Sequence, residues 1–412
     1  MNVWVLNHYA VLPSEAGGTR HYDLGKALVR RGHRVTIFAS SFQHFRHREE
    51  KLDPGETWRI EDVGGVRFVW IRTAPYQRND WRRVLNMVTF MFRSWLLGRR
   101  LPRRVPGFAE PDVVVGSSVH LLAVLAAWGL SKYHRAGFIV EVRDLWPESL
   151  VKLGQLRERH PIVMMLRVLA GFLYKRACRI VVLGPQMCGR IAGQGVNAER
   201  IVWIPNGVNL ELFEGIPNGA LPAERFDVVY MGAHGRANAL DVLLDAAGIL
   251  QSEGPLGIRF VLVGDGPEKL SLIAQSRRLG LRNVEFRDPV SKAEVPIVLR
   301  DAAVCVSTTE PAFASYGGSL NKLSDYMAAG RPTILSGVAA GNPVEEAGNG
   351  RTVPPRDPRA LADAVLWIYR LSQEERDTMG RRGRAFVEEH RDISKLAERL
   401  ERVIEDVTRN RG

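Results

Sequence analysis

Cysteine is scarce in this sequence, with three residues among 412. Cys178, Cys188 and Cys305 do not have the short, repeated spacings of a metal site, and an odd number of cysteines cannot all pair within one chain. This usage excludes a disulfide-stabilised secreted domain and is typical of a reducing compartment.

Long apolar runs are also missing. The longest apolar stretches, HLLAVLAAWGL (120–130) and PIVMMLRVLAGFLY (161–174), are shorter than the roughly 18–20 residues that span a bilayer, and Arg167 interrupts the second. The N-terminal MNVWVLNHY has neither the basic region nor the long apolar segment of a signal peptide. We therefore expect a cytoplasmic protein.

Two phosphate-binding fingerprints are absent as well. The sequence contains neither G-x-G-x-x-G after its first strand nor G-x-x-x-x-G-K-[ST], so it does not favour a nicotinamide enzyme or a P-loop nucleotidase. No short tandem repeat or low-complexity segment is visible, which argues against a solenoid or a disordered chain.

Positive charge, in contrast, is abundant. The net charge is +12 and the pI is about 9.9. Such a balance calls for an anionic partner, which can be nucleic acid, anionic lipid or a phosphorylated substrate. Charge alone does not choose among these three.

Short β-branched runs alternate with helix-length amphipathic segments, which is the pattern of parallel sheets with crossover helices. The pattern runs from VWVL to RIVVLG, pauses in a stretch rich in Pro, Gly and Asn (204–224), and restarts with FDVVYMG. We predict an α/β chain of two doubly wound Rossmann-like domains facing across a cleft, at residues 1–205 and 206–385. Residues 386–412 are expected to form a C-terminal helix that returns to the first domain.

The stretch GGSLNKLSDYMAAGRPTI (317–334) combines glycines, a lysine and a carboxylate around one helix. Gly330 can end a helix in the left-handed conformation, and the following proline cannot continue it, so we predict a helix at 320–329. The preceding glycines allow close approach of a ligand, while free N–H groups and the helix dipole favour an anion. Lys322 and Asp325 share one face, where they suit a phosphate and sugar hydroxyls. The alternative is a surface helix with an ordinary ion pair.

Other candidate groups follow predicted strands. Gly17 and Gly18 come after the first strand and precede a helix, where they can approach a phosphate or form a plain turn. His120, Arg143 and Asp144 also follow strands, so we expect them at the reactive edge of the sheet. For His120, the alternative is a simple role at a helix N-terminus. The two histidines of HFRHREE lack a third ligand, so no metal site is expected.

The segment WRRVLNMVTFMFRSWLLGRRLPRR (81–104) has the pattern of an interfacial membrane helix. Apolar residues at helical spacing are Val84, Met87, Val88, Met91 and Trp95. Arginines crowd the C-terminal end of the segment. The alternative is a core-packing helix with a basic tail, but that alternative leaves the arginine cluster unexplained.

Together these pieces resemble the retaining GT-B-fold glycosyltransferases that use nucleotide sugars, the large family 4 group. The resemblance covers essentially the whole chain, through GGTRHYDLGKALVRRGHRVTIF, IPNGVNLELF, VLVGDGPE and LNKLSDYMAAGRPTI in the order of the family. It is nearest to members that add amino sugars in O-antigen or capsule synthesis. It implies that residues 1–205 bind the acceptor and residues 206–385 the nucleotide sugar.

The resemblance also implies roles for individual residues. Asp325 would bind the ribose hydroxyls, His120 would line the sugar site as a catalytic residue, and Arg143 with Asp144 would contact the acceptor. The remaining donor contacts implied by these motifs are Gly17, Gly18, Arg20, Gly232, Ser319, Leu320 and Asn321.

Two departures from the family pattern concern charge. The first of the two usual carboxylates would fall at Gly317, and the usual Arg and Lys after the first strand of the second domain align with Ala233 and Asn238. Arg236 and Lys322 are therefore expected to replace these cations and to stabilise the leaving diphosphate as catalytic groups.

The sequence thus predicts transfer of an N-acetylamino sugar from a UDP-sugar to a lipid-linked saccharide, at the inner face of the plasma membrane and without a metal or other cofactor. The basic helix near 81–104 would dock on the membrane. The alternatives are a sugar-nucleotide 2-epimerase of the same fold and a non-catalytic basic scaffold on a membrane. Nucleic acid is not expected as a partner, because aromatic and basic residues do not alternate as a stacking platform requires.

Overall fold

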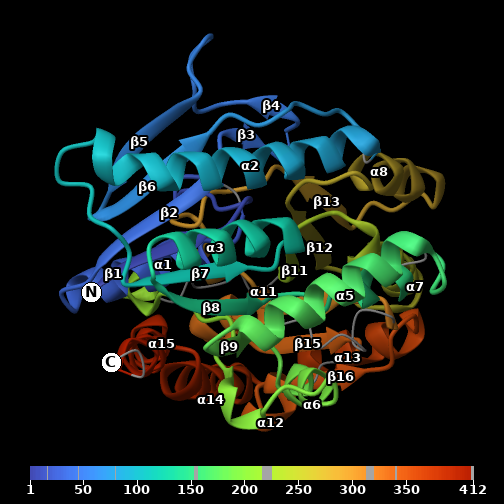
Figure 1. Cartoon of the computed structure of the whole chain (residues 1–412). Coiled ribbons are helices and arrows are strands. Elements are labelled where there is room, and N and C mark those ends of the chain that lie inside the picture. The colour runs from blue at the N-terminus through green and yellow to red at the C-terminus, as the bar shows by residue number, and fades with distance from the viewer. Residues whose placement is uncertain are drawn as a thin grey trace. The chain divides into compact units, whose positions relative to one another are not determined.

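The computed structural model describes residues 1–15, 17–44, 46–78, 80–152, 156–215, 225–311, 320–338 and 341–409. The chain divides into two compact units, whose elements are labelled in Figure 1. Unit 1 comprises Met1–Leu12, Gly18–Pro205 and Ser394–Gly412, and unit 2 comprises Pro13–Gly17 and Asn206–Ile393.

Unit 1 contains one large, mostly parallel sheet. Its strands are β1 (Asn2–Leu6), β2 (Arg34–Ser40), β5 (Trp58–Val63), β6 (Val66–Ile71), β7 (Val113–Ser117), β8 (Gly137–Val142), β9 (Arg179–Val182) and β10 (Ile201–Trp203). Their order is β10-β9-β8-β7-β1-β2-β6-β5, and only the β5–β6 pair is antiparallel within this sheet. The direction of winding reverses between β1 and β7, which makes the ends of these two strands a switch point where α/β sheets bind ligands. Two short strands, β3 (Phe42–Gln43) and β4 (Arg48–Glu49), pair separately.

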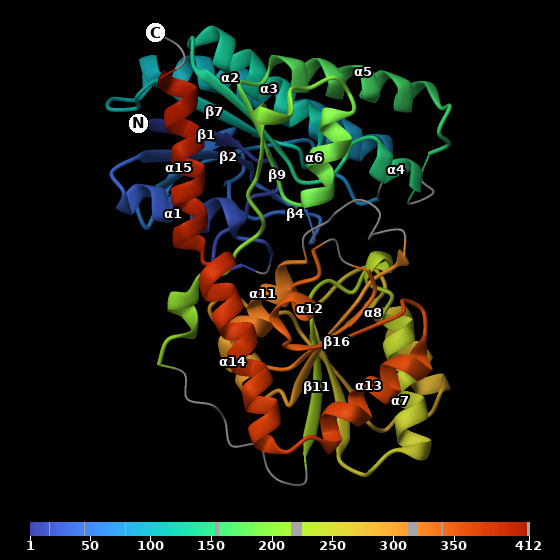
Figure 2. The same ribbon diagram turned by 90° about the horizontal axis from the view of Figure 1, so that it is seen from below.

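Helices cover both faces of this sheet. They are α1 (Arg20–Arg30), α2 (Trp81–Arg104), α3 (Leu121–Tyr133), α4 (Glu148–Lys152), α5 (Pro161–Arg176), α6 (Pro185–Ala192) and α15 (Ile393–Arg409). Trp4 and Leu6 of β1 pack into the core beneath α2 and α3, whereas Val3 and Val5 face α1 and α15, as the two-residue period of a strand requires. Figure 2 shows α15 running beside α1. Glu401 fixes α15 there, because its carboxylate pairs with His33 at 2.7 Å.

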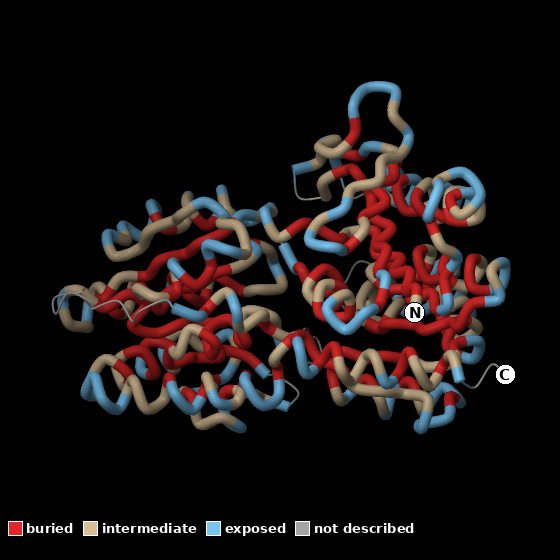
Figure 3. The backbone as a smooth tube through the Cα atoms, turned by 90° about the vertical axis from the view of Figure 1, so that its left-hand side faces the viewer, coloured by how far each residue is buried: buried red, intermediate tan, exposed pale blue. Residues whose placement is uncertain are grey.

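Unit 2 contains a six-stranded, fully parallel sheet in the order β13-β12-β11-β14-β15-β16. The strands are β11 (Phe226–Met231), β12 (Ile258–Val263), β13 (Val284–Arg287), β14 (Val304–Thr308), β15 (Thr333–Ser336) and β16 (Gly350–Val353). The helices are α7 (Leu240–Glu253), α8 (Lys269–Arg278), α9 (Val295–Arg300), α11 (Asn321–Ala328), α12 (Pro343–Ala347), α13 (Pro358–Arg370) and α14 (Gln373–His390). The central strands are buried along their length, as Figure 3 shows for both units. Here the winding reverses between β11 and β14.

These sheets confirm the predicted fold class of two doubly wound, parallel α/β sheets. The predicted helix at 320–329 is observed as α11, and Gly330 follows it with a φ of 64°. The sequence analysis missed β5, β10 and β16, which are edge strands in which most side chains are only partly buried. Among the described helices, none has the length and apolarity needed to cross a bilayer.

Helix α2 differs in one respect from the expected interfacial helix. Met87 is buried, and Met91 and Trp95 pack against the core of unit 1, so these residues form its inward face. A second apolar stripe lies on the outward face and contains Trp81, Leu85, Phe92 and Leu96. The inward face is that of a core-packing helix, and contact of the outward stripe with a membrane stays a prediction.

Candidate functional site

The candidate donor site lies at the carboxyl edge of the sheet in unit 2. It consists of the loops after β11 and β12 and the beginning of α11. Leu320 is the N-cap of α11, and within the described residues no side chain caps the helix there. The first N–H groups of a helix lack partners within the helix and suit an anion, although the Leu323 N–H already donates to the Leu320 carbonyl. Ser319, predicted to contribute a donor contact, lies outside the described residues.

Tyr326 positions α11 against β11. Its hydroxyl accepts a hydrogen bond from the Met231 N–H at 2.9 Å and lies 3.2 Å from the Met231 carbonyl, to which it can donate. Tyr326 is fully buried. Since Lys322 lies one turn earlier on the same helix, this contact fixes where the lysine meets the β11 loop.

The ammonium of Lys322 is held by neutral groups. Its Nζ donates to Asn238 Oδ1 at 2.8 Å and to the Tyr230 hydroxyl at 3.0 Å, and it lies 4.4 Å from the centre of the Tyr230 ring. No carboxylate among the described residues forms an ion pair with it. Because burial disfavours the charged form, the pKa of Lys322 is lowered to about 7. An anion placed here would restore the charge.

The lysine thus reaches the position where the resemblance expects a cation. Asn238 occupies the place of the usual lysine in the β11 loop, and Lys322 from α11 contacts its side chain directly. Arg236 begins the short 3₁₀ turn of the same loop, and its side chain is exposed. Arg236 thus lies in the loop after β11, and Lys322 reaches the same loop from α11. Of these two predicted replacement cations, only Lys322 has a side chain that hydrogen-bonds other described residues.

Asp325 has a partner other than Lys322. Its two carboxylate oxygens lie 2.6 and 2.7 Å from Lys292 Nζ, and the residue is buried. The ordinary ion pair between Lys322 and Asp325 that the sequence left open therefore does not form. A carboxylate has more lone pairs than one ammonium uses, so Asp325 can still accept hydrogen bonds from hydroxyls.

Glycines bring the two loops into close contact. Gly232 and Gly264 have φ values of 151° and 146°, and a Cβ on Gly264 would lie 1.9 Å from the Gly232 carbonyl oxygen. No side chain fits there, so the backbone after β11 and β12 stays open to a ligand. Asn321 opens α11 beside these loops, and its buried Oδ1 has no hydrogen-bond partner among the described residues.

The other predicted residues lie in the long loop after β1 and directly after β8. Gly18 is exposed, as is Gly17, which is grouped with unit 2. The Arg143 N–H donates to Ser118 Oγ at 3.0 Å, and Asp144 is exposed.

His120 and His8 form a buried pair at the ends of β7 and β1, the switch point of unit 1. The Ala123 N–H donates to His120 Nδ1 at 3.1 Å, so the proton of His120 is on Nε2, which donates to His8 Nδ1 at 2.6 Å. Burial lowers the pKa of both imidazoles, that of His120 to about 3, so both are neutral. His8 also stacks on Phe90 with ring centres 4.3 Å apart.

The histidines of the HFRHREE segment join this aromatic cluster. His44 stacks on Tyr9, with ring centres 4.5 Å apart, and hydrogen-bonds the Tyr76 hydroxyl. Burial lowers the pKa of His44 to about 4. His44 is therefore a packed, neutral ring.

Arg20 belongs to a buried polar network that the sequence analysis did not identify. Its Nε donates to Glu141 at 2.8 Å, and its terminal nitrogens donate to the carbonyls of Ile204 and Pro205. Glu141 also accepts from His21 Nε2 at 2.6 Å and from Ser117 Oγ at 2.9 Å. Burial alone would raise the pKa of Glu141, but His21 and Arg20 outweigh it and hold this pKa well below its usual range.

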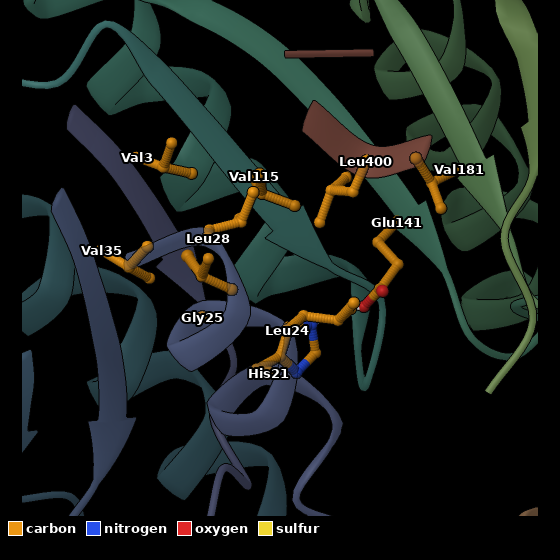
Figure 4. A pocket seen from close by; sticks show the side chains of 11 residues that line it. Val3, His21, Leu24, Gly25, Leu28, Val35, Val115, Glu141, Val181 and Leu400 are labelled. Carbon is orange, nitrogen blue, oxygen red and sulfur yellow. Dashed lines mark hydrogen bonds and ion pairs between the residues drawn. The ribbon is translucent and has the colours of Figure 1, made fainter. Parts of the chain in front are cut away.

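Figure 4 shows His21 and Glu141 turned toward one another at the margin of a small cavity. The cavity measures about 20 Å³, and otherwise apolar side chains from β1, α1 and α15 surround it. It has room for roughly one water molecule. We therefore regard it as part of the core and not as a substrate pocket.

Two family models match most of the chain. Residues 225–370 match the family model "Glycosyl transferases group 1", and residues 16–207 match "Glycosyl transferase 4-like domain". "Probable glycosyltransferase WbjE" of Pseudomonas aeruginosa is 27% identical over 314 residues, which are 72% of this chain and 75% of that protein.

Solved structures show the same fold. A sucrose-phosphate synthase from Thermosynechococcus elongatus has a TM-score of 0.77 at 19% identity and covers 99% of both chains. HepE from Anabaena, in complex with UDP and glucose, has a TM-score of 0.69 at 16% identity over 98% of this chain and 99% of its own.

Replacing Glu141 by glutamine should destabilise the protein by about 3 kcal/mol at pH 7, because Arg20 would be left buried without its counter-charge. A carboxylate whose pKa is lowered by folding contributes stability above its unfolded pKa and loses it as pH falls through the folded one. Urea unfolding should therefore show that the difference in unfolding free energy between wild type and Glu141→Gln shrinks as pH falls below about 4. A constant difference down to pH 2.5 would show that ionisation of Glu141 is not the source.

Proposed function

Because the chain belongs to the group 1 glycosyltransferases, the nucleotide-sugar-dependent family 4 enzymes of the GT-B fold, we propose that it transfers an N-acetylamino sugar from a UDP-sugar to a lipid-linked saccharide with retention of configuration. A relative from Escherichia coli that is 22% identical over 295 residues supports a role in surface polysaccharide synthesis, since it carries the name "Putative colanic acid biosynthesis glycosyl transferase WcaI". HepE, of the same fold, was solved with UDP, which supports a uridine nucleotide as the donor.

One observation carries this proposal: Lys322 Nζ hydrogen-bonds Asn238 in the loop after β11. Sugar transfer leaves negative charge on the departing diphosphate, and fixed donors at that position lower the barrier. Lys322, the free amides at the start of α11 and Arg236 in the facing loop would supply these donors. Asp325, one turn deeper, would accept hydrogen bonds from the ribose.

The groups of unit 1 would then serve the acceptor side. Arg143 and Asp144 lie after β8 and would contact the phosphate or sugar of the acceptor. Both ring nitrogens of His120 are engaged, so His120 would line the sugar site with its carbon edge. Arg20 would act through Glu141 by holding the end of β8 in place.

The acceptor proposal also rests on an apolar surface of unit 1. Large side chains that face solvent occur on α2 and on α5, two helices that flank α3 on one face of the sheet (Figure 1). They are Trp81, Val84, Leu85, Phe92 and Leu96 on α2, and Ile162, Met164, Met165 and Val168 on α5. Phe92 is 56% exposed and Val168 is 73% exposed. Scattered apolar residues are normal on a surface, but a gathered set marks an interaction site.

Charge indicates which partner covers this surface. Helix α2 carries arginines at both ends and no carboxylate, and its exposed arginines include Arg82, Arg100, Arg103 and Arg104. Apolar side chains bordered by arginines fit a layer of anionic lipids. We propose that this surface, α2 with α5, docks on the membrane that holds the acceptor.

Exchanging Lys322 and Asn238, whose side chains hydrogen-bond each other, tests the donor site. Lys322→Asn should lower kcat/KM with a UDP-sugar by about 10²–10³-fold, since it removes one donor to the leaving group. Adding Asn238→Lys moves the ammonium to the β11 loop and should restore at least a tenth of the activity. UDP release in the presence of a polyprenyl-diphosphate saccharide provides the measurement. If Lys322→Asn turned over at the wild-type rate, the assignment of Lys322 would be wrong.

Binding of UDP should weaken as pH rises above 7. Lys322 has a pKa of about 7 in the free protein, and a bound diphosphate would raise it, so binding takes up a proton above that pH. Affinity should then fall by up to about tenfold per pH unit between pH 7 and 9. Calorimetry with Lys322→Arg, whose charge does not titrate in this range, should show a flat profile. An equal slope in both proteins would contradict this reading.

Negative charge introduced on the exposed apolar side chains tests the membrane surface. Leu85→Glu combined with Phe92→Glu, or Met165→Glu with Val168→Glu, should each weaken binding to vesicles of phosphatidylglycerol by about tenfold or more. Leu270→Glu is the matched control, because Leu270 is 82% exposed but lies on α8 of unit 2. Sedimentation with vesicles gives the bound fraction. Unchanged binding in both double variants would refute docking through this surface.

A further inference from the structure

His234, in the loop after β11, is a buried polar residue that has no role in the function proposed above. Its exposed fraction is 0%, and within the described part of the chain neither ring nitrogen has a hydrogen-bond partner. An imidazole buried in this way costs stability, because its donor and acceptor lose their water without replacement. An apolar side chain of similar shape would fill the space without this cost. The residue therefore calls for a functional explanation.

Backbone hydrogen bonds hold His234 in place, so the fold of the loop fixes the position of its ring. The His234 N–H donates to the Asp265 carbonyl at 2.8 Å, and its own carbonyl accepts from the Glu268 N–H at 2.9 Å. A Cβ on Gly266 would come within 2.5 Å of that carbonyl. The loops after β11 and β12 are thus packed backbone to backbone around this residue.

His234 and Lys322 approach the same pair of glycines from different elements. His234 Nε2 lies 3.4 Å from the position of a Cβ on Gly264, and Lys322 Nζ lies 3.4 Å from that of a Cβ on Gly232. These two glycines contact each other, as described above. A diphosphate bound over the glycines would therefore be close to both nitrogen-bearing side chains.

Charged groups on neighbouring elements act on the protonation of the His234 ring. Lys322 of α11 and Lys269 of α8 repel a proton on His234, whereas Asp265 of the β12 loop attracts one. Tyr230 of β11 and Phe286 of β13 contribute only rings, with centres 6.0 and 6.1 Å away. Burial first, and then Lys269, lowers the pKa of His234 to about 4, so the free protein holds it neutral.

We propose that His234 is a second latent cation of the donor site, which takes up a proton from solvent when a nucleoside diphosphate binds over Gly232 and Gly264. This inference rests on the proposed function of the same site. The proton on the imidazole adds positive charge beneath the phosphates without direct contact, so His234 is a positioning residue for charge. Together with Lys322, it replaces a permanently charged arginine and lysine by two groups whose charge depends on occupancy of the site.

The direct test follows the ring of His234 by NMR in the intact protein. The Cε1–H resonance, assigned by its loss in His234→Gln, should titrate at a pH at least one unit higher with saturating UDP than without it. His390→Gln, a change on exposed α14 far along unit 2, serves as the control and should leave both titrations unchanged. If the resonance titrates at the same pH with and without UDP, the proposal is wrong.

Calorimetry separates failure of the role proposed for His234 from failure of the donor site itself. At pH 6, where Lys322 is already mostly protonated, wild type should take up a fraction of a proton on binding UDP that His234→Gln does not. If UDP raises the pKa of His234 by about two units, His234→Gln should also bind UDP about twofold more weakly at pH 6. His234→Phe should keep or raise the melting temperature while losing the same affinity, which separates charge from folding. If UDP does not bind wild type, the donor site itself fails; if both proteins bind with equal proton uptake, only the role of His234 fails.

Discussion

An ammonium group held by neutral partners is the feature on which the account of this protein depends. Lys322 donates to Asn238 and Tyr230, and within the described residues no carboxylate pairs with it. A half-buried cation without a counter-ion is unfavourable, and this is why its pKa falls toward neutrality. A bound diphosphate would relieve that cost of burial, which favours binding of the leaving group that the reaction produces.

The fold makes this arrangement possible by coupling a helix to a strand. Tyr326 ties α11 to the end of β11, and this contact brings a lysine from α11 to the loop where the family usually carries its own cations. The loop itself then needs no large side chain, and Gly232 can pack against Gly264. In unit 1, the corresponding switch point carries neutral, stacked rings, and the nearby Arg83 guanidinium adds to burial in lowering the pKa of His120. The two units therefore offer chemically different surfaces at equivalent places in the same type of sheet.

Hydrophobic periodicity and the positions of strand ends predicted the α/β class and α11, and they named Lys322 as a candidate residue whose role stays a prediction. They could not predict that Asp325 pairs with Lys292, because this contact joins residues 33 positions apart. Glu141 was missed for the same reason, since its meaning depends on Arg20 from α1. For 81–104, helical spacing identified an apolar face but could not tell the face toward the core, with Met87, from the face toward solvent, with Phe92.

A structure of the protein with UDP is the most direct measurement. The account predicts that Lys322 Nζ lies about 3 Å from an oxygen of the diphosphate, with the phosphates above Gly232 and the first turn of α11. A diphosphate bound elsewhere, with Lys322 still hydrogen-bonded only to Asn238 and Tyr230, would contradict it.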